Sequence, residues 1–327
     1  MKKARSKSVT KSAETGRIND VIFKELIKRG HSNEGKTHVW NIADSKLWYL
    51  TPKQAQSFLD LERSKDYQKD VIQKEVDLIR GNIKEVLITV GTGPLNIIDL
   101  GCGDGKKAAL FVEQLKGKVK LRYCPIDISG YMVEKAIKTM RNLNAGEVVQ
   151  FQWNISDFEN LENVSALLRQ EEYKKNFILL LGNTLGNFEI NELLYTVRSS
   201  MREGDLLLIG NGLDNRHKDE LTKSYNNDAV NNFQINVPFQ IGLTEKDIEF
   251  GVRFRNSRIE ILYTLKKDKK ITFQNKTIEF NRGDKIITAI SYKYDKYDFM
   301  AFMKMYFEDV KMYVSPDEMY ALVLCKK

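Results

Sequence analysis

Residues 96–110 read N-I-I-D-L-G-C-G-D-G-K-K-A-A-L: an apolar run, glycines at every second position, then residues that favour helices. The pattern predicts a buried strand, a tight turn and the start of a helix. Gly101, Gly103 and Gly105 suit such a turn, because a glycine backbone adopts unusual dihedral angles and lets a ligand approach closely. The helix that follows would offer free N–H donors and a partial positive charge, so the stretch indicates a ligand site.

Two cofactors use a glycine-rich turn of this kind. The dinucleotide fingerprint G-x-G-x-x-G would place its third glycine where Lys106 stands. The spacing G-x-G-x-G, with Asp99 just before it, is closer to that of S-adenosylmethionine (SAM) methyltransferases. The turn at 101–107 does not have the G-x-x-x-x-G-K-[ST] spacing of a phosphate loop. SAM is therefore the expected cofactor, although the motif alone leaves open a turn without a ligand.

The composition is that of a large folded protein, since 42% of the 327 residues are hydrophobic and 29% are charged. This length predicts one large domain or two interleaved ones, and no apolar run is long enough to span a membrane. Residues 1–16 are polar and basic, so we expect a disordered tail rather than a secretory signal. The three cysteines have no paired spacing, which favours a cytoplasmic protein without a disulfide framework.

The net charge of +8 raises the question of a nucleic-acid partner. The lysines are scattered, however, and aromatic residues are not interleaved with the basic runs as in single-strand binders. The three histidines lack the spacing of metal ligands. We therefore expect a small-molecule substrate, no metal, no membrane partner and a monomer, and nucleic acid is disfavoured.

Acidic residues follow the next strands of the predicted sheet. Residues 120–128 form a strand that reaches Asp127, about two dozen residues beyond the glycine turn, where a carboxylate can accept both hydroxyls of a ribose. A third strand is predicted near 148–153, and Asp157 and Phe158 come just after it. An acid and an aromatic ring at that point could take the amino group and the ring face of an adenine.

Two further apolar runs, 177–181 and 205–210, complete a doubly wound sheet. In such sheets ligands bind at the carboxyl ends of the strands. The loops that follow the strands should therefore converge on one crevice, namely 101–107, 127–129, 157–158 and 182–188.

The pattern changes after this sheet. A helix is predicted over 217–232, and from 248 to 294 apolar residues recur with period two, which indicates an antiparallel meander with turns at Asn256-Ser257 and Gln274-Asn275. A helix over 295–307 and two strands, 309–314 and 319–325, then follow.

These elements predict an α/β fold, a class I methyltransferase Rossmann-like doubly wound sheet with an inserted α+β substrate-binding lid domain. Near the start, residues 17–31 indicate a helix and 38–52 an irregular aromatic segment that ends in a Thr51-Pro52 helix start. The predicted lid comprises 17–51 and 215–291, and the predicted SAM-binding domain comprises 52–214 and 292–327.

From residue 17 onward the chain resembles the histidine Nα-methyltransferases of ergothioneine biosynthesis, a group to which fungal dimethylallyltryptophan N-methyltransferases also belong. The most specific segment is L-L-G-N-T-L-G-N-F at 180–188, which is similar to the family's L-G-[ST]-T-I-G-N. Further matches are W-Y-L-T at 48–51, Tyr225, and S-Y-K-Y at 291–294. The resemblance implies a SAM domain with a substrate lid built from split segments.

The resemblance also implies roles for individual residues. Asn187 and Tyr225 would be the catalytic residues that hold the α-amino and carboxylate groups of an amino acid. Ser291 would contact the substrate side chain, and Trp48 replaces a family tyrosine that faces the substrate. SAM would be held by Gly101, Gly103, Lys107, Asp127, Asp157 and Phe158.

Two positions depart from the histidine enzymes. Ala289 stands where the family has a glutamate that binds the imidazole, and Ile261 stands where it has a methionine. Loss of the carboxylate removes a charge-assisted hydrogen bond worth about 1.5–3 kcal/mol and leaves an apolar space. We therefore predict N-methylation of the α-amino group of an amino acid or related amine with an aromatic or apolar side chain.

Other functions stay open. Enzymes that methylate amino groups of nucleic acids usually carry D/N-P-P-Y/F after the fourth strand, and this chain has G-N-T-L-G-N-F there. A peptide or protein amine, an RNA substrate, and a SAM-binding module without catalysis are the alternatives.

Overall fold

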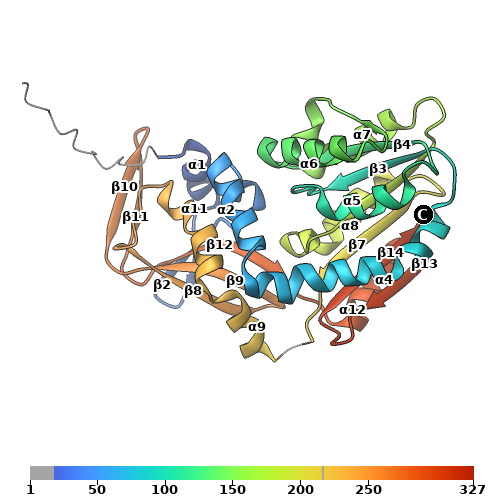
Figure 1. The fold of residues 1–327 in the computed structure, drawn as a ribbon. Coiled ribbons are helices and arrows are strands. Elements are labelled where there is room, and N and C mark those ends of the chain that lie inside the picture. Colours follow the sequence, from blue (N-terminus) through green and yellow to red (C-terminus); the bar gives the residue numbers. More distant parts are fainter. Residues whose placement is uncertain (1–17, 216) are drawn as a thin grey trace, which may run out of the picture.

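The computed structural model describes residues 18–215 and 217–327, and the predicted tail at 1–16 lies outside them. Its larger sheet has seven strands: β3 (Leu95–Leu100), β4 (Leu121–Ile126), β5 (Glu147–Val148), β6 (Lys175–Leu180), β7 (Leu206–Gly212), β13 (Asp309–Val314) and β14 (Tyr320–Lys326). Their order is β13-β14-β7-β6-β3-β4-β5. Strands β7, β6, β3, β4 and β5 are parallel, whereas β14 is antiparallel to both its neighbours. The predicted doubly wound sheet with a closing hairpin is confirmed (Figure 1).

Helices cover both faces of this sheet. One face carries α4 (Gln73–Val90), α5 (Lys106–Leu115) and α6 (Gly130–Leu143), and the other carries α7 (Leu161–Leu168), α8 (Ile190–Ser200) and α12 (Lys296–Tyr306). Every residue of β3 is buried as a result, with Ile97 packed on the first face and Ile98 on the second. Coverage of both faces explains why these strands are continuous apolar runs rather than alternating ones.

A second sheet brings the start of the chain against residues 248–292. Its order is β1-β2-β12-β9-β8, with β1 (Ser32–Glu34), β2 (Thr37–Asn41), β8 (Ile248–Arg255), β9 (Arg258–Leu265) and β12 (Lys285–Tyr292). In Figure 1 it lies to the left of the larger sheet. The helices in this part of the chain are α1 (Asp20–Arg29), α2 (Pro52–Glu62), α9 (Lys218–Tyr225), α10 (Asp228–Gln234) and α11 (Asn236–Phe239).

The predicted simple meander is wrong in its strand pairing. Strand β12 pairs antiparallel with β9 and parallel with β2, whereas β10 (Lys269–Phe273) and β11 (Lys276–Phe280) form a separate ribbon. The alternating pattern shows which segments are strands. It gives no sign that β12 pairs with β2, a strand far away in the sequence. The two predicted turns are confirmed, since Asn256, Ser257, Gln274 and Asn275 all have positive φ, as tight hairpin turns require.

Three local predictions are also corrected. Residues 38–52 are not wholly irregular, because β2 begins at Thr37. The helix predicted over 217–232 is two helices, and the Asn227 side chain caps the second by accepting from the N–H of Val230 at 3.0 Å. The third strand ends at Val148; beyond it the Asn154 side chain donates to Pro125 O, and the chain pairs with the end of β4 again only at the Asp127–Ile155 bridge.

The turn after β3 needs glycine for two different reasons. Gly105 has φ +77°, and a Cβ there would lie 3.0 Å from the Ala136 Cα on α6. Gly117, at the other end of α5, has φ +73° but open space where its Cβ would lie. Gly105 therefore allows both the backbone conformation and the close packing of α5 on α6.

Substitution of the two glycines should separate these effects. Gly117→Ala should lower the free energy of unfolding by about 1–2 kcal/mol, the cost of a left-handed alanine. Gly105→Ala should cost about 1–3 kcal/mol more, because it adds the overlap with α6. Urea unfolding of the ligand-free protein measures both, and equal losses would show that the packing of α5 on α6 relaxes freely.

Candidate active site

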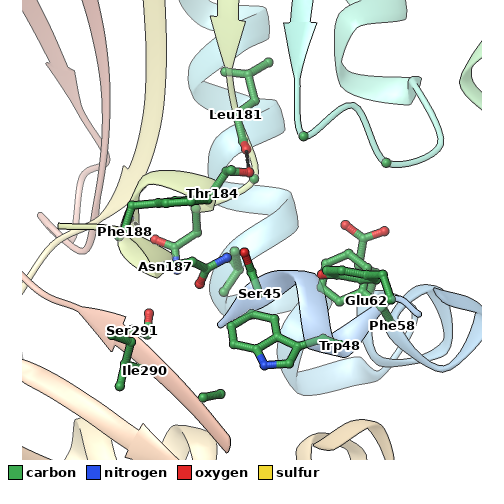
Figure 2. Close-up of a pocket in the computed structure, with 18 of the residues that line it drawn as sticks. Ser45, Trp48, Phe58, Glu62, Leu181, Thr184, Asn187, Phe188, Ile290 and Ser291 are labelled. Atoms are coloured by element: carbon green, nitrogen blue, oxygen red, sulfur yellow. Dashed lines mark hydrogen bonds between the residues drawn. The ribbon is translucent and has the colours of Figure 1, made fainter. Parts of the chain in front are cut away.

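One cavity of about 690 Å³ lies where the loops after β3, β4 and β6 meet β9 and β12. Every candidate residue from the sequence lines it. The lining includes Gly101, Gly103, Lys107, Asp127, Asp157 and Phe158, together with Trp48, Asn187, Tyr225, Ile261, Ala289 and Ser291. Figure 2 shows Trp48, Asn187 and Ser291 around this space, each from a different part of the chain.

The glycine turn and Asp127 form one unit. Asp127 follows β4, and its carboxylate accepts from the N–H of Gly103 at 3.2 Å and from the N–H of Ser129 at 2.9 Å. Burial raises the pKa of Asp127 to about 6, although these two N–H donors act to lower it. Since a Cβ on Gly103 would meet nothing within 4 Å, the turn presents bare backbone beside this carboxylate.

A second carboxylate, that of Asp99, lies behind the turn. It accepts a hydrogen bond from the Tyr123 hydroxyl at 2.7 Å, and only 4% of the residue is exposed. Burial raises the pKa of Asp99 to about 7 even though the hydrogen bond acts to lower it. Both acids at this end of the cavity therefore titrate closer to neutrality than exposed acids.

Lys107 is paired with an acid that the sequence analysis missed. The Glu75 carboxylate, fully buried on α4, accepts from Lys107 Nζ at 2.8 Å and from the N–H of Gly182 at 2.8 Å. Burial acts to lower the pKa of Lys107, but the Glu75 and Glu62 carboxylates raise it above its ordinary value. Helical periodicity could have predicted that Glu75 is buried, because it shares the apolar face of α4 with Leu78 and Ile79.

Asp157 and Phe158 lie at the start of a short helix, η4 (Phe158–Asn160). The Asp157 carboxylate caps it by accepting from the N–H of Glu159 at 3.2 Å. The Phe158 ring packs against the Phe188 ring with centroids 5.4 Å apart. The loops after β5 and β6 therefore join at an aromatic pair on the cavity wall.

Asn187 and Tyr225 reach the cavity from distant elements. Asn187 is the last residue of η5 (Thr184–Asn187), after β6, and Tyr225 is the last residue of α9. The Tyr225 hydroxyl lies 3.3 Å from the Ser291 Oγ on β12. Gly186 allows η5 to approach this strand, since a Cβ there would lie 3.2 Å from the same Oγ.

A β-bulge shapes the wall beside Ser291. The pairing of β12 with β9 shifts between Ile287 and Ala289, and the carbonyl of the intervening Thr288 accepts from Trp48 Nε1 at 2.7 Å. Directly after the bulge, Ala289 pairs with Ile261 across the strands. The two departures from the histidine enzymes are therefore cross-strand neighbours, and Trp48 is fixed beside them.

Aromatic rings complete this end of the cavity. The Phe233 ring lies 6.2 Å from Trp48, 5.9 Å from Tyr49 and 5.4 Å from Phe58, centroid to centroid. All four residues line the cavity. Tyr49, Phe58 and Phe233 were not predicted from the sequence, because their convergence depends on the packing of α2 against α10.

Within residues 18–215 and 217–327, no group of acids, histidines and cysteines is arranged to hold a metal ion. The cysteines Cys102, Cys124 and Cys325 are free and buried. In that same part of the chain, no helix combines the length and the apolar character needed to cross a bilayer.

Comparison with known proteins gives a family match and several structural likenesses. A family model described as "histidine-specific methyltransferase, SAM-dependent" matches residues 53–327. None of the curated proteins matches the sequence.

Three solved structures illustrate the likeness. A SAM-dependent methyltransferase from Clostridium acetobutylicum is 12% identical, with a TM-score of 0.44, over 83% of this chain and 98% of that chain. The PH0226 protein from Pyrococcus horikoshii is 12% identical, with a TM-score of 0.45, over 84% and 98%. Magnesium protoporphyrin IX methyltransferase from Synechocystis, solved with S-adenosylhomocysteine (SAH), is 11% identical, with a TM-score of 0.44, over 83% and 93%.

The family match covers the glycine turn, Asp127, the 180–188 segment and every strand of the larger sheet. The chain therefore belongs to the family of histidine-specific, SAM-dependent methyltransferases, and it is a SAM-dependent methyltransferase with a class I Rossmann-like fold.

Proposed function

We propose that this methyltransferase acts on the α-amino group of an amino acid or related amine whose side chain is aromatic or apolar. The observation that carries the proposal is Ala289, which is 2% exposed and lines the cavity where histidine enzymes of the family place a glutamate. An imidazole bound there would lose its charge-assisted partner and keep a buried N–H.

The neighbours of Ala289 support an apolar side chain. Elements β9, β12 and α10 bring no acidic residue to the described cavity wall. Their contribution is Ile261, Ala289, Ile290, Ser291, Tyr292, Val230, Phe233 and Gln234. Ile261 faces Ala289 across the strands, so the space left by the missing glutamate is bordered by a second apolar side chain.

The opposite end of the cavity fits SAM. The bare backbone of Gly103 beside Gly101 would admit the nucleoside, the Asp127 carboxylate would accept the ribose hydroxyls, and Asp157 and Phe158 would face the adenine. When bound, SAM supplies an electrophilic methyl group on its sulfonium.

Asn187, Tyr225 and Ser291 would orient the amine between these two ends. A free α-amine is largely protonated at neutral pH, so the site must bind it and favour its neutral form. The side chains provide amide and hydroxyl groups on three elements, which suits positioning rather than covalent catalysis. Solvent would take the proton.

The substrate proposal is tested by a panel of amino acids with SAH formation as the readout. Tryptophan, tyrosine, phenylalanine and leucine should be methylated in preference to histidine. Ala289→Glu should shift the preference toward histidine by about 10- to 100-fold, the value of one charge-assisted hydrogen bond.

Ala289→Gln is the matched control, because it adds nearly the same volume without the charge. It should reduce turnover of the large substrates without a comparable gain on histidine. Efficient trimethylation of histidine by the unmodified protein would overturn the proposal.

The affinity for SAH should depend on the ionisation of Asp127. The pKa of this carboxyl is raised to about 6 in the free protein, and hydroxyl donors favour the ionised form. Affinity should therefore be constant above pH 6 and fall by about tenfold per pH unit below it, because binding must then release a proton. Calorimetry between pH 4.5 and 7.5 measures this slope.

Asp127→Asn should bind SAH more weakly at pH 7 and lose most of the slope. Asp60→Asn, at an exposed residue of α2 outside the cavity, should behave as the unmodified protein does. A pH slope that survives in Asp127→Asn would assign the titration to another group.

A further inference from the structure

A lysine lines the cavity directly after β12. Only 3% of Lys293 is exposed, and its Nζ donates to the Ser291 Oγ at 3.1 Å. The same ammonium lies 5.4 Å from the centroid of the Tyr225 ring. It therefore adjoins two of the residues that would hold the substrate.

This ammonium has no acidic partner among the described residues, where its interactions are with Ser291 and the Tyr225 ring. Other cations that are largely buried do have one: Lys107 pairs with Glu75, and Arg169 pairs with Asp205. A buried charge is costly unless it is paired and hydrogen-bonded. An anionic group of a ligand in the cavity would therefore stabilise the Lys293 ammonium.

The course of β12 indicates how a molecule bound through its anionic group would be oriented in the cavity. Ala289, Ser291 and Lys293 alternate with less buried neighbours and so share one face. At about 3.3 Å per residue, Lys293 lies roughly 13 Å along the strand from Ala289, with Ser291 midway. A molecule whose anionic group contacts Lys293 would extend its other end toward Ala289 and Ile261.

Gly212 lies beside both the Lys293 ammonium and the Asn183 side chain. A Cβ on Gly212 would lie 3.6 Å from the Lys293 Nζ and 3.3 Å from the Asn183 Oδ1. The N–H of Gly212 donates to that same Oδ1 at 2.8 Å, which fixes the Asn183 side chain. Lys293 thus lies where β7, the 182–188 loop and β12 meet, at the end of the wall opposite Ala289.

We propose that Lys293 binds the α-carboxylate of the substrate and thereby selects free amino acids over amines and peptides that lack this group. This inference rests on the proposed function and narrows its substrate class. Asn187 and Tyr225 would then position the amino group, while Lys293 neutralises the carboxylate next to it. The side chain of the amino acid would lie against Ala289.

The test compares each amino acid of the panel with its carboxamide, by calorimetry in the presence of SAH. The unmodified protein should bind at least one acid about 10- to 100-fold more tightly than its amide, the range expected for a charge-assisted contact. Lys293→Met should abolish this preference by weakening the acid alone. Lys293→Arg, which keeps the charge, should retain most of it.

Lys285→Met is the matched control, since Lys285 lies on the same strand outside the cavity and pairs with Glu34 at the surface. It should leave the acid-to-amide ratio unchanged. SAH affinity reports folding in every variant, and if Lys293→Met fails to fold, the unmodified protein and Lys293→Arg still decide the question.

Equal binding of every acid and its amide, or an equal loss for both in Lys293→Met, would overturn the inference. Such a result with turnover intact would leave the proposed function standing. Preferential binding of an acid without methylation of any amine would instead support Lys293 and reject the proposed function.

Discussion

The buried carboxylate of Glu75 joins α4, α5 and the end of β6 beside the glycine turn. It accepts from the backbone of Gly182 at the end of β6 and from Lys107 on α5, while it is itself carried by α4. Gly210 on β7 makes room for it, since a Cβ there would overlap the carboxylate. Removal of one partner from a buried ion pair typically costs about 3–5 kcal/mol, so these elements are held in one arrangement.

The hydrogen bond from Gly182 to Glu75 fixes where the 182–188 loop begins. The course of the loop in turn brings Gly186 against Ser291 on β12. Gly186 and Gly212 lack the side chains that would keep the loop and strand apart. Asn183 accepts from the backbone of Gly212, so the loop is held against β7 as well. The glycine-turn end of the cavity and the wall formed by β12 are thus joined through a short loop that has contacts on both sides.

The sequence was sufficient for features encoded in short segments. The strand, turn and helix at 96–110, the hairpin turns at Asn256-Ser257 and Gln274-Asn275, and the Thr51-Pro52 helix start are each determined by local backbone preferences, and the structure has all of them. The fold class followed from their order. The 180–188 segment carried the resemblance to the family, and in the structure its Gly182 and Asn183 adopt positive φ.

Features that depend on distant partners could not be predicted in this way. The parallel pairing of β2 with β12 joins residues more than two hundred positions apart, and no local pattern marks it. The alternating pattern gives no sign of the bulge at Thr288. The bulge leaves the Thr288 carbonyl available to accept a hydrogen bond from Trp48 Nε1. Lys293 was part of a recognised motif, but only the structure shows that its charge is buried without an acid among the described residues.

The cavity wall formed by β9 and β12 also indicates how substrate specificity could change within one fold. Ala289 and Ile261 are cross-strand partners, so a glutamate at the first position would contact whatever stands at the second. An acid beside Ile261 would be buried against an apolar neighbour, and an alanine beside a longer, flexible side chain would leave unfilled space. The two positions are therefore expected to change together, whereas Lys293, Ser291 and Tyr225 lie further along the wall and are free to stay the same. Under the proposed function, specificity for the side chain and recognition of the amino-acid backbone would be separated along β12.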